Sequence, residues 1–413
     1  MCGQVVSSVK QNGGEAPESY LALFAWLAQG LGAWPREGGR LPPASLVIVP
    51  AHLFFFTLSA FEALTETAQN VCVYMVTFHK WLVMFYHHND YRSLIRRLDM
   101  NFGMPEQRTD PEYSEIISRC VKELRTLTVV WTMMVFVTLS SMMIIPWTTQ
   151  LLSGGGNSPE NITLWNETIP ADSGSFPYRN WTPFDDWPQP YYAVLYLYHV
   201  FMGATLIYMI PLYDLLYFAF VHHACAQFAV LHRSLEGLRA RAEAAGAAGA
   251  AGAAAREAHM RRCVASCARH HDALHTFVEG VESIVNPVFL NQFVGSSVLF
   301  CMTAFQLAVN STVDMKMITM GALLVSAVFE LGIFCFFGNR VMDDSRGVGQ
   351  AAYNSEWYHA SPATKRSISI IMLRSVRPAK LTFGKFAPLS LETYGSILQI
   401  SYTYFTVLNR LNE

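Results

Sequence analysis

Seven long apolar stretches decide what this chain can fold into. They cover residues 44–61, 67–86, 126–152, 190–218, 286–310, 317–338 and 386–408. A helix needs about 20 mostly apolar residues to cross the hydrocarbon core of a bilayer, and each stretch approaches or exceeds that length. Charged residues make up 15% of the chain, against roughly 25% in an ordinary soluble domain. The sequence therefore predicts an all-α membrane protein with seven transmembrane helices.

Four charged residues interrupt these stretches: Lys80, Asp214, Glu330 and Glu392. Lys80 lies near the end of the second stretch, where a long side chain can extend to the membrane interface. Glu330 lies well inside the sixth stretch, where a charge is expensive to bury. The second and sixth spans are therefore the least clearly defined.

Lysine and arginine are distributed unevenly between the apolar stretches. Of the 29 such residues, 26 lie before the first stretch or within 80–125, 233–269 and 340–385. The alternate segments hold only Arg179, Lys316 and Arg410. Cytosolic flanks of membrane helices carry the excess of positive charge. We therefore predict an intracellular N-terminus and, after seven spans, an extracellular C-terminus.

Glycosylation sequences give a second indication of orientation. Asn-x-Ser/Thr tripeptides begin at Asn161, Asn166 and Asn180, all within the segment 153–189. Such asparagines are modified only on the lumenal side of the membrane. The charge distribution places the same segment outside, so two independent features agree.

The same pattern divides the chain into six regions. The N-terminal region is expected to hold an interfacial or re-entrant helix, and helical extensions of the fourth and fifth spans are expected in the cytosol, on both sides of a flexible Ala/Gly insertion at 242–255. Another helix is expected at 365–376. The regions are a cytosolic N-terminus (1–42), helices one to four with the extracellular loop 153–189 (43–220), cytosolic extensions (221–285), helices five and six (286–340), a cytosolic anchor segment (341–385) and a last helix (386–413).

Histidine and cysteine recur every four residues at His259, Cys263, Cys267 and His271. These are ligand types that zinc favours. The first and last would lie about 18 Å apart along one helix, however, too far to surround a single ion. We interpret the four residues as a helix-packing face and expect no metal. Histidine doublets at helix ends leave a pH switch as an alternative.

Motifs of known enzymes are missing from the sequence. It contains no Gly-rich phosphate loop, no Gly-x-Ser-x-Gly elbow and no His-Glu-x-x-His pair. We therefore expect no enzymatic activity and no cofactor. The net charge of −2 argues against nucleic acid as a partner, because such binding needs a concentrated basic surface. A G-protein-coupled receptor is an alternative for seven spans, but its N-terminus would be outside.

The C-terminal third carries the most specific pattern. Phe-Cys-Phe-Phe-Gly-Asn at 334–339 is followed by Ser345, by Ala-Tyr-Asn at 352–354 and by Trp357, and the last helix contains Tyr-Thr-Tyr-Phe-Thr at 402–406. This order and spacing resemble the C-terminal signature of the insect odorant receptors. A gustatory-type receptor is the related alternative, but its usual ending is missing, since Leu411 and Asn412 stand where Gln-Phe would.

The resemblance implies a tetrameric, nonselective channel for monovalent and divalent cations, gated by an odorant. In this family the last helix lines the pore, and most members are tuning subunits that act with a shared co-receptor in the plasma membrane of the olfactory neuron dendrite. This chain lacks the co-receptor's long insertion and ending, which favours a tuning subunit. Matching the family's gate places Val407 and Leu411 at its hydrophobic constriction. Arg410 is a further pore candidate, with a position facing the lipid headgroups as the alternative for its side chain.

A small hydrophobic volatile would be bound in the outer half of the bundle, where the resemblance places the ligand. Aromatic residues and methionine suit such a ligand because they offer contact area with few directional bonds. Helical spacing selects ten candidate residues, although ordinary bundle packing is the alternative role for each: Val71, Tyr74, Met75, Ser140, Met143, Trp147, Tyr198, Met202, Met302 and Phe305.

Overall fold

A computed structural model describes residues 64–99, 111–152, 162–164, 167–169, 189–245, 252–309 and 315–412. The predicted first span, the N-terminal region 1–42 and the three candidate glycosylation sites Asn161, Asn166 and Asn180 lie outside these ranges. The described part is nearly all helical. Its helices are α4 (Leu64–Tyr86), α5 (His88–Asp99), α6 (Pro111–Leu152), α7 (Gln189–Glu236), α8 (Leu238–Ala245), α9 (Gly252–Val309), α10 (Met315–Tyr353), α11 (Pro362–Ser375) and α12 (Leu391–Asn412).

Four helices, α6, α7, α9 and α10, are long and apolar enough to cross a membrane by length and composition. A shorter apolar stretch, Val71–Tyr86, belongs to α4. The last predicted span corresponds to α12, which has 22 residues. With 48 and 58 residues, α7 and α9 far exceed the about 20 that a bilayer needs. They continue beyond the predicted spans as helices, as the sequence predicted.

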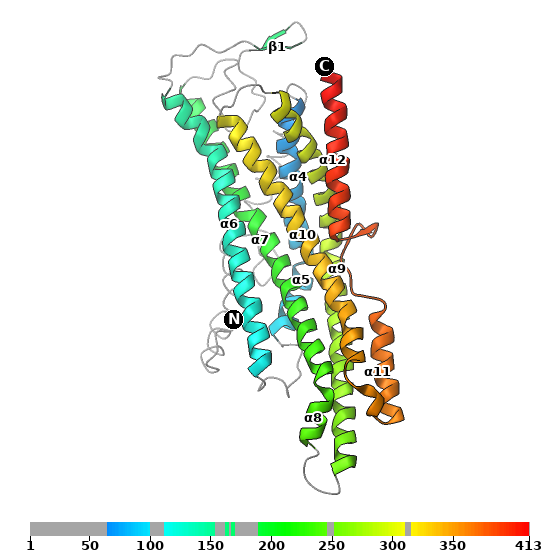
Figure 1. The fold of residues 1–413 in the computed structure, drawn as a ribbon. Coiled ribbons are helices and arrows are strands. Elements are labelled where there is room, and N and C mark those ends of the chain that lie inside the picture. Colours follow the sequence, from blue (N-terminus) through cyan, green and yellow to red (C-terminus); the bar gives the residue numbers. More distant parts are fainter. Residues whose placement is uncertain are drawn as a thin grey trace.

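The long helices form an elongated bundle (Figure 1). The C-terminal end of α12 and the hairpin of β1 (Ile162–Leu164) and β2 (Glu167–Ile169) lie at one end of this bundle. The helices α8 and α11 lie at the other end. Segments that the charge pattern assigns to opposite sides of the membrane are therefore at opposite ends of the molecule.

Aromatic side chains from α7, α9 and α10 fill the middle of the bundle. The ring of Tyr217 lies 4.9 Å from Phe289 and 5.2 Å from Phe334, both edge-on, which is the arrangement that aromatic pairs prefer. The Tyr217 hydroxyl donates a hydrogen bond to the carbonyl oxygen of Phe334 over 3.2 Å. All three side chains are buried, so three membrane helices are joined at one level.

The segment before α12 is attached to α9 and α10. A Cβ atom on Gly338 would overlap Leu389, so only glycine lets this segment approach α10 so closely. Ser345 Oγ accepts a hydrogen bond from the Ala379 backbone N–H over 3.0 Å. A short hairpin, β3 (Thr382–Phe383) and β4 (Ala387–Pro388), follows. These contacts give a structural reason for Gly338 and Ser345 in the C-terminal pattern.

The anchor segment contains the helix that was expected at 365–376. It is α11, and it begins at Pro362, with Ser361 as its N-cap. Glu257 of α9 accepts hydrogen bonds from the Ser361 and Thr364 hydroxyls, the latter over 2.6 Å. A short helical turn, Trp357–His359, connects α10 to α11. The two ends of the expected Ala/Gly insertion are helical, because α8 ends at Ala245 and α9 begins at Gly252.

Candidate ligand pocket and pore helix

Met143 of α6 packs against the N-terminal half of α7. A Cβ atom on Gly203 would lie 2.7 Å from the Met143 sulfur, so the glycine makes room for the thioether. The Tyr196 hydroxyl donates a hydrogen bond to the Met143 carbonyl oxygen over 2.8 Å. Tyr198 is half-buried and Met202 is 1% exposed, and both lie on this part of α7. The structure therefore brings Met143 into the same neighbourhood as the predicted residues of α7.

The predicted residues of α4 and α9 also share one level. Gly295 of α9 faces Val76 of α4, and Gly280 of α9 faces Leu94 of α5, so α9 runs antiparallel to the α4–α5 segment. Continuing this register places Val71 opposite the turn of α9 that precedes Met302. Val71 packs against the hydrophobic core, and Tyr74 is buried in it. Among the described helices, α4, α6, α7 and α9 thus each bring predicted residues to the half of the bundle that holds the C-terminal end of α12 (Figure 1).

The remaining predicted ligand residues are placed differently. Met75 is 44% exposed, so its side chain does not lie with Tyr74 in the interior. Ser140, Met302 and Phe305 are half-buried. The side chain of Trp147 lies outside the part of the structure that is described.

Buried polar residues in this half of the bundle escaped the sequence reasoning. Thr303 and Gln306 of α9 are buried beside Met302 and Phe305. A hydrogen bond of 2.9 Å joins the hydroxyls of Thr138 in α6 and Ser326 in α10. A ligand site of this kind is mostly apolar with a few polar groups that orient the ligand. Selecting only aromatic residues and methionine could not have found them.

The last helix has one packed side and one uncovered side. Ile397 and Ser401 are buried, whereas Ile400, Thr403, Tyr404 and Val407 are exposed. The exposed residues follow helical spacing and form one stripe along α12. Val407 is 51% exposed. Arg410 is exposed too, and the side chain of Leu411 lies outside the described residues.

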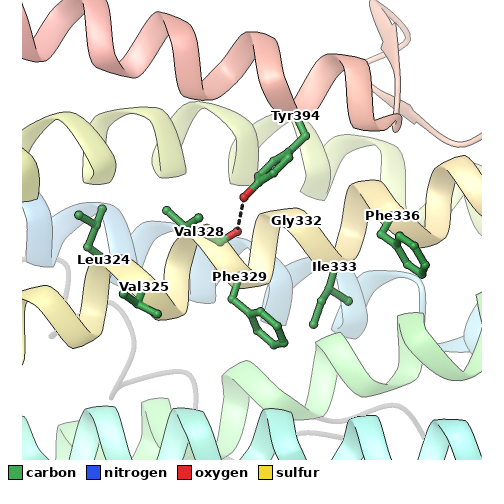
Figure 2. Close-up of a pocket in the computed structure, with 8 residues that line it drawn as sticks. All are labelled: Leu324, Val325, Val328, Phe329, Gly332, Ile333, Phe336 and Tyr394. Carbon is green, nitrogen blue, oxygen red and sulfur yellow. Dashed lines mark hydrogen bonds between the residues drawn. The ribbon is translucent and has the colours of Figure 1, made fainter.

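An open cavity of about 510 Å³ lies along α10, beside Tyr394 of α12 (Figure 2). Tyr394 reaches from α12 toward α10, and its hydroxyl donates a hydrogen bond to the Val328 carbonyl oxygen over 3.2 Å. None of the ten predicted ligand residues lines this cavity. Its walls are Leu324, Val325, Val328, Phe329, Gly332, Ile333, Phe336 and Tyr394.

Three charged residues from different helices meet inside the bundle. Lys80 Nζ of α4 lies 2.7 Å from Asp214 Oδ1 of α7 and 2.7 Å from Glu330 Oε1 of α10. The exposed fractions of these three side chains are 2%, 0% and 13%. The expectation that Lys80 extends to the membrane interface is wrong, because two carboxylates hold it in the interior. The sequence signal for this cluster was a single charged residue in each of three predicted spans: Lys80 is positive, and Asp214 and Glu330 are negative.

Long apolar helices around a buried ion cluster define an α-helical membrane protein. The chain belongs to the insect odorant receptor family, since the model of the family "7tm Odorant receptor" matches residues 61–402. This result confirms the resemblance that the C-terminal pattern indicated, and the all-helical membrane fold with it.

Individual relatives resemble parts of the chain. Odorant receptor 13a of Drosophila melanogaster is 26% identical over 253 residues, which are 58% of each chain. Odorant receptor Or2 of Anopheles gambiae is 27% identical over 145 residues, which are 35% of this chain and 38% of the relative. The chain thus spans between about a third and three-fifths of the length of these relatives.

Solved structures match over nearly the whole length. The insect olfactory receptor OR5 of Machilis hrabei in complex with eugenol has a TM-score of 0.73 and 15% identity, with 95% of this chain and 98% of that chain covered. The same receptor in a second structure has a TM-score of 0.71 and 14% identity, with 94% and 97% covered. At such identities the likeness establishes a common fold.

Proposed function

We propose that this protein is the odorant-binding subunit of a heteromeric, odorant-gated, nonselective cation channel, in which it acts with the odorant-receptor co-receptor. The observation that carries the proposal is the uncovered stripe of α12 in a chain of this family. A membrane helix with Ile400, Tyr404 and Val407 exposed, and with Thr403 and Thr406 among them, suits a pore wall. Hydrophobic constrictions close such pores by dewetting, and Val407 and Leu411 are the residues proposed for this gate.

The ligand site belongs, in this proposal, to the outer half of the bundle. Met143, Tyr198 and Met202 supply the apolar contact area between α6 and α7. Tyr74 and Met302 bound the site from α4 and α9. Thr303 and Gln306 offer hydrogen bonds to a ligand with one polar group. A small hydrophobic volatile fits this chemistry.

The subunit is proposed to contact its neighbours through the end of the bundle that holds α11. Ile370, Leu373 and Val376 are 62%, 73% and 74% exposed. They lie outside the predicted spans, where lipid does not cover them. Exposed apolar groups of this kind mark protein contact surfaces. Co-receptor subunits are the partners that we infer for this surface.

Orientation remains a proposal of the charge pattern: N-terminus inside, C-terminus outside. The arrangement of Figure 1 supports it, because the β1–β2 hairpin and the end of α12 share one end of the bundle. Glycosylation mapping tests it. Mobility shifts that disappear on Asn161→Gln and Asn166→Gln place the loop outside, while a modified tag at the N-terminus would contradict the orientation.

Current recording tests the channel proposal. Cells that express this chain with the co-receptor should give odorant-evoked cation currents against a panel of volatiles. Cells with this chain alone, or with the co-receptor alone, should lack the response to the same odorant. A second-messenger response without a direct cation current would contradict the proposal.

A further inference from the structure

We propose that Lys80, Asp214 and Glu330 form a latch that holds α10 in the closed arrangement of the channel and releases it through the contact between Lys80 and Glu330. The inference rests on the proposed channel function. It assigns these three as positioning residues, since they act on the gate through α10 and do not touch the proposed ligand or the permeating ion.

Burial makes this cluster different from the other ion pairs of the described chain. Lys80 and Asp214 are 2% and 0% exposed, while pairs such as Arg119 with Glu115 are 71% exposed on both sides. The Lys80 ammonium also lies 5.6 Å from the Tyr213 ring centre and 5.4 Å from that of Phe334. Removing one partner of a buried pair leaves an uncompensated charge, so the contacts strongly favour one arrangement of the helices.

The position of Glu330 links the cluster to the pore helix. Glu330 lies two residues from both Val328 and Gly332, which is about 200° around the helix axis. Val328 accepts the hydrogen bond from Tyr394 of α12, and a Cβ on Gly332 would lie 3.3 Å from the Tyr394 ring. One side of α10 is therefore tied to α4 and α7 by charge, and the other side carries α12. Moving α10 changes both contacts.

The cluster is also connected to the proposed ligand site. Lys80 lies on α4 beyond Tyr74, and Asp214 lies on α7 beyond Met202. A ligand that shifts α4 or α7 changes the distance from Lys80 to α10. A ligand can bias a gate only by its differential affinity for two arrangements, and the latch supplies a contact that differs between them.

Glu330 is the partner that the latch releases. Its side chain is 13% exposed, whereas that of Asp214 is 0% exposed. Glu330 is on α10, the helix that accepts the hydrogen bond from Tyr394 of α12, whereas Asp214 is on α7. Lys80 therefore keeps Asp214 as its partner in both arrangements and separates from Glu330 when α10 moves.

The ligand-free current tests the latch. Co-expressed with the co-receptor, Glu330→Gln and Lys80→Met should each raise the fraction of the maximal current that flows without odorant by about tenfold, the change that roughly 1.4 kcal/mol of lost preference produces. The double variant should add little, because both substitutions remove the same contact, the one between Lys80 and Glu330. Glu115→Gln, at an exposed pair, is the matched control and should leave the fraction unchanged.

A charge exchange separates the latch from a mere folding role. The variant Lys80→Glu with Glu330→Lys and Asp214→Asn rebuilds one attractive pair without placing two carboxylates side by side, and it should restore the low ligand-free current. The latch is wrong if single variants reach the surface with wild-type ligand-free current, or if none of the variants, the exchange included, reaches the surface. The proposed function fails separately, if the wild-type chain gives no odorant-evoked current with the co-receptor.

Discussion

The hydroxyl of Tyr394 in α12 donates a hydrogen bond to the Val328 carbonyl oxygen in α10 over 3.2 Å. Tyr394 sits over Gly332, a position of α10 without a side chain. The helix proposed to line the pore is thus joined to α10 by one directional contact on a shared surface. The contact borders the cavity of Figure 2.

Removing that hydrogen bond should change gating and leave the fold intact. Tyr394→Phe keeps the ring and deletes one bond, worth about 0.5–1.5 kcal/mol. We expect the odorant concentration for half-maximal current to shift by about two- to tenfold, since a bond between moving helices is specific to one arrangement. Dose–response recording measures the shift. An unchanged curve with normal surface expression would exclude the contact from gating.

Gly338 should tolerate no side chain. A Cβ there would lie 2.7 Å from the carbonyl oxygen of Leu389 and would overlap its Cβ, and backbone atoms cannot turn away as a side chain can. Gly338→Ala should therefore destabilise the protein by about 1–3 kcal/mol. Thermal unfolding of purified protein measures the change.

Gly321 offers a matched control in the same helix, because a Cβ there meets no atom within 4 Å. Gly321→Ala should stabilise α10 slightly, by up to about 1 kcal/mol, since alanine is the better helix former. Equal unfolding temperatures for the two variants would contradict the close approach at Gly338.

Acid should destabilise the bundle end that holds α11. Burial lowers the pKa of His271 to about 3, and repulsion from His275 and Arg374 contributes to this shift. Burial and Arg374 lower the pKa of His275 to about 4, while Asp272 opposes them. The two Nε2 atoms are 3.1 Å apart, so the folded pair is stable only when at least one of the two imidazoles is neutral.

The direction of the pH dependence follows from the protonation of the two histidines in the folded and the unfolded chain. Above the ordinary histidine pKa of 6.5, both the folded and the unfolded chain hold neutral imidazoles, and stability does not depend on these groups. Below it the unfolded chain takes up protons and the folded chain does not, so stability falls as the pH drops toward about 4. Unfolding temperatures over this range should fall less steeply for His271→Gln and His275→Gln. A parallel decline in both variants would assign the acid sensitivity to other groups.

Tyr74 tests the proposed ligand site. Tyr74→Ala removes a buried aromatic side chain from α4 and should weaken the odorant response by about tenfold or more, since each loss of about 1.4 kcal/mol in binding free energy is tenfold in affinity. Current through a constitutively open channel should change much less. Met75→Ala, at an exposed position of the same helix, is the control. Equal losses of odorant response and constitutive current would remove Tyr74 from the site.

The sequence predicted the helices well because apolar length is a local property. Six of the seven predicted spans fall on described helices, and the helix expected at 365–376 is α11. Lys80 shows where local reasoning ends. Counted among the cytosolic positive charges, it lies in the interior instead, because Asp214 and Glu330 reach it from helices 134 and 250 residues away.

Side-chain direction limited the site prediction in the same way. Met75 and Tyr74 are neighbours in sequence, yet one is exposed and the other is buried. Helical spacing defines a face but not the neighbour that the face will contact. Met143 could be placed only once Gly203 was seen to make room for it on α7. Sequence therefore predicted the helices reliably but not which neighbours each side chain contacts.

Arg410 offers the sharpest test of how this chain enters the pore. It lies one turn beyond Val407 near the end of α12, and it is exposed. If its guanidinium faces the permeation path, its charge opposes cation entry, and Arg410→Gln should raise conductance and the permeability of divalent relative to monovalent cations. Divalent ions should gain more, because their repulsion from one positive charge is about twice as large. Single-channel recording of the co-expressed receptor measures both. Arg410→Lys keeps the charge and should behave as the wild type, whereas unchanged conductance and selectivity in Arg410→Gln would place the side chain outside the pore.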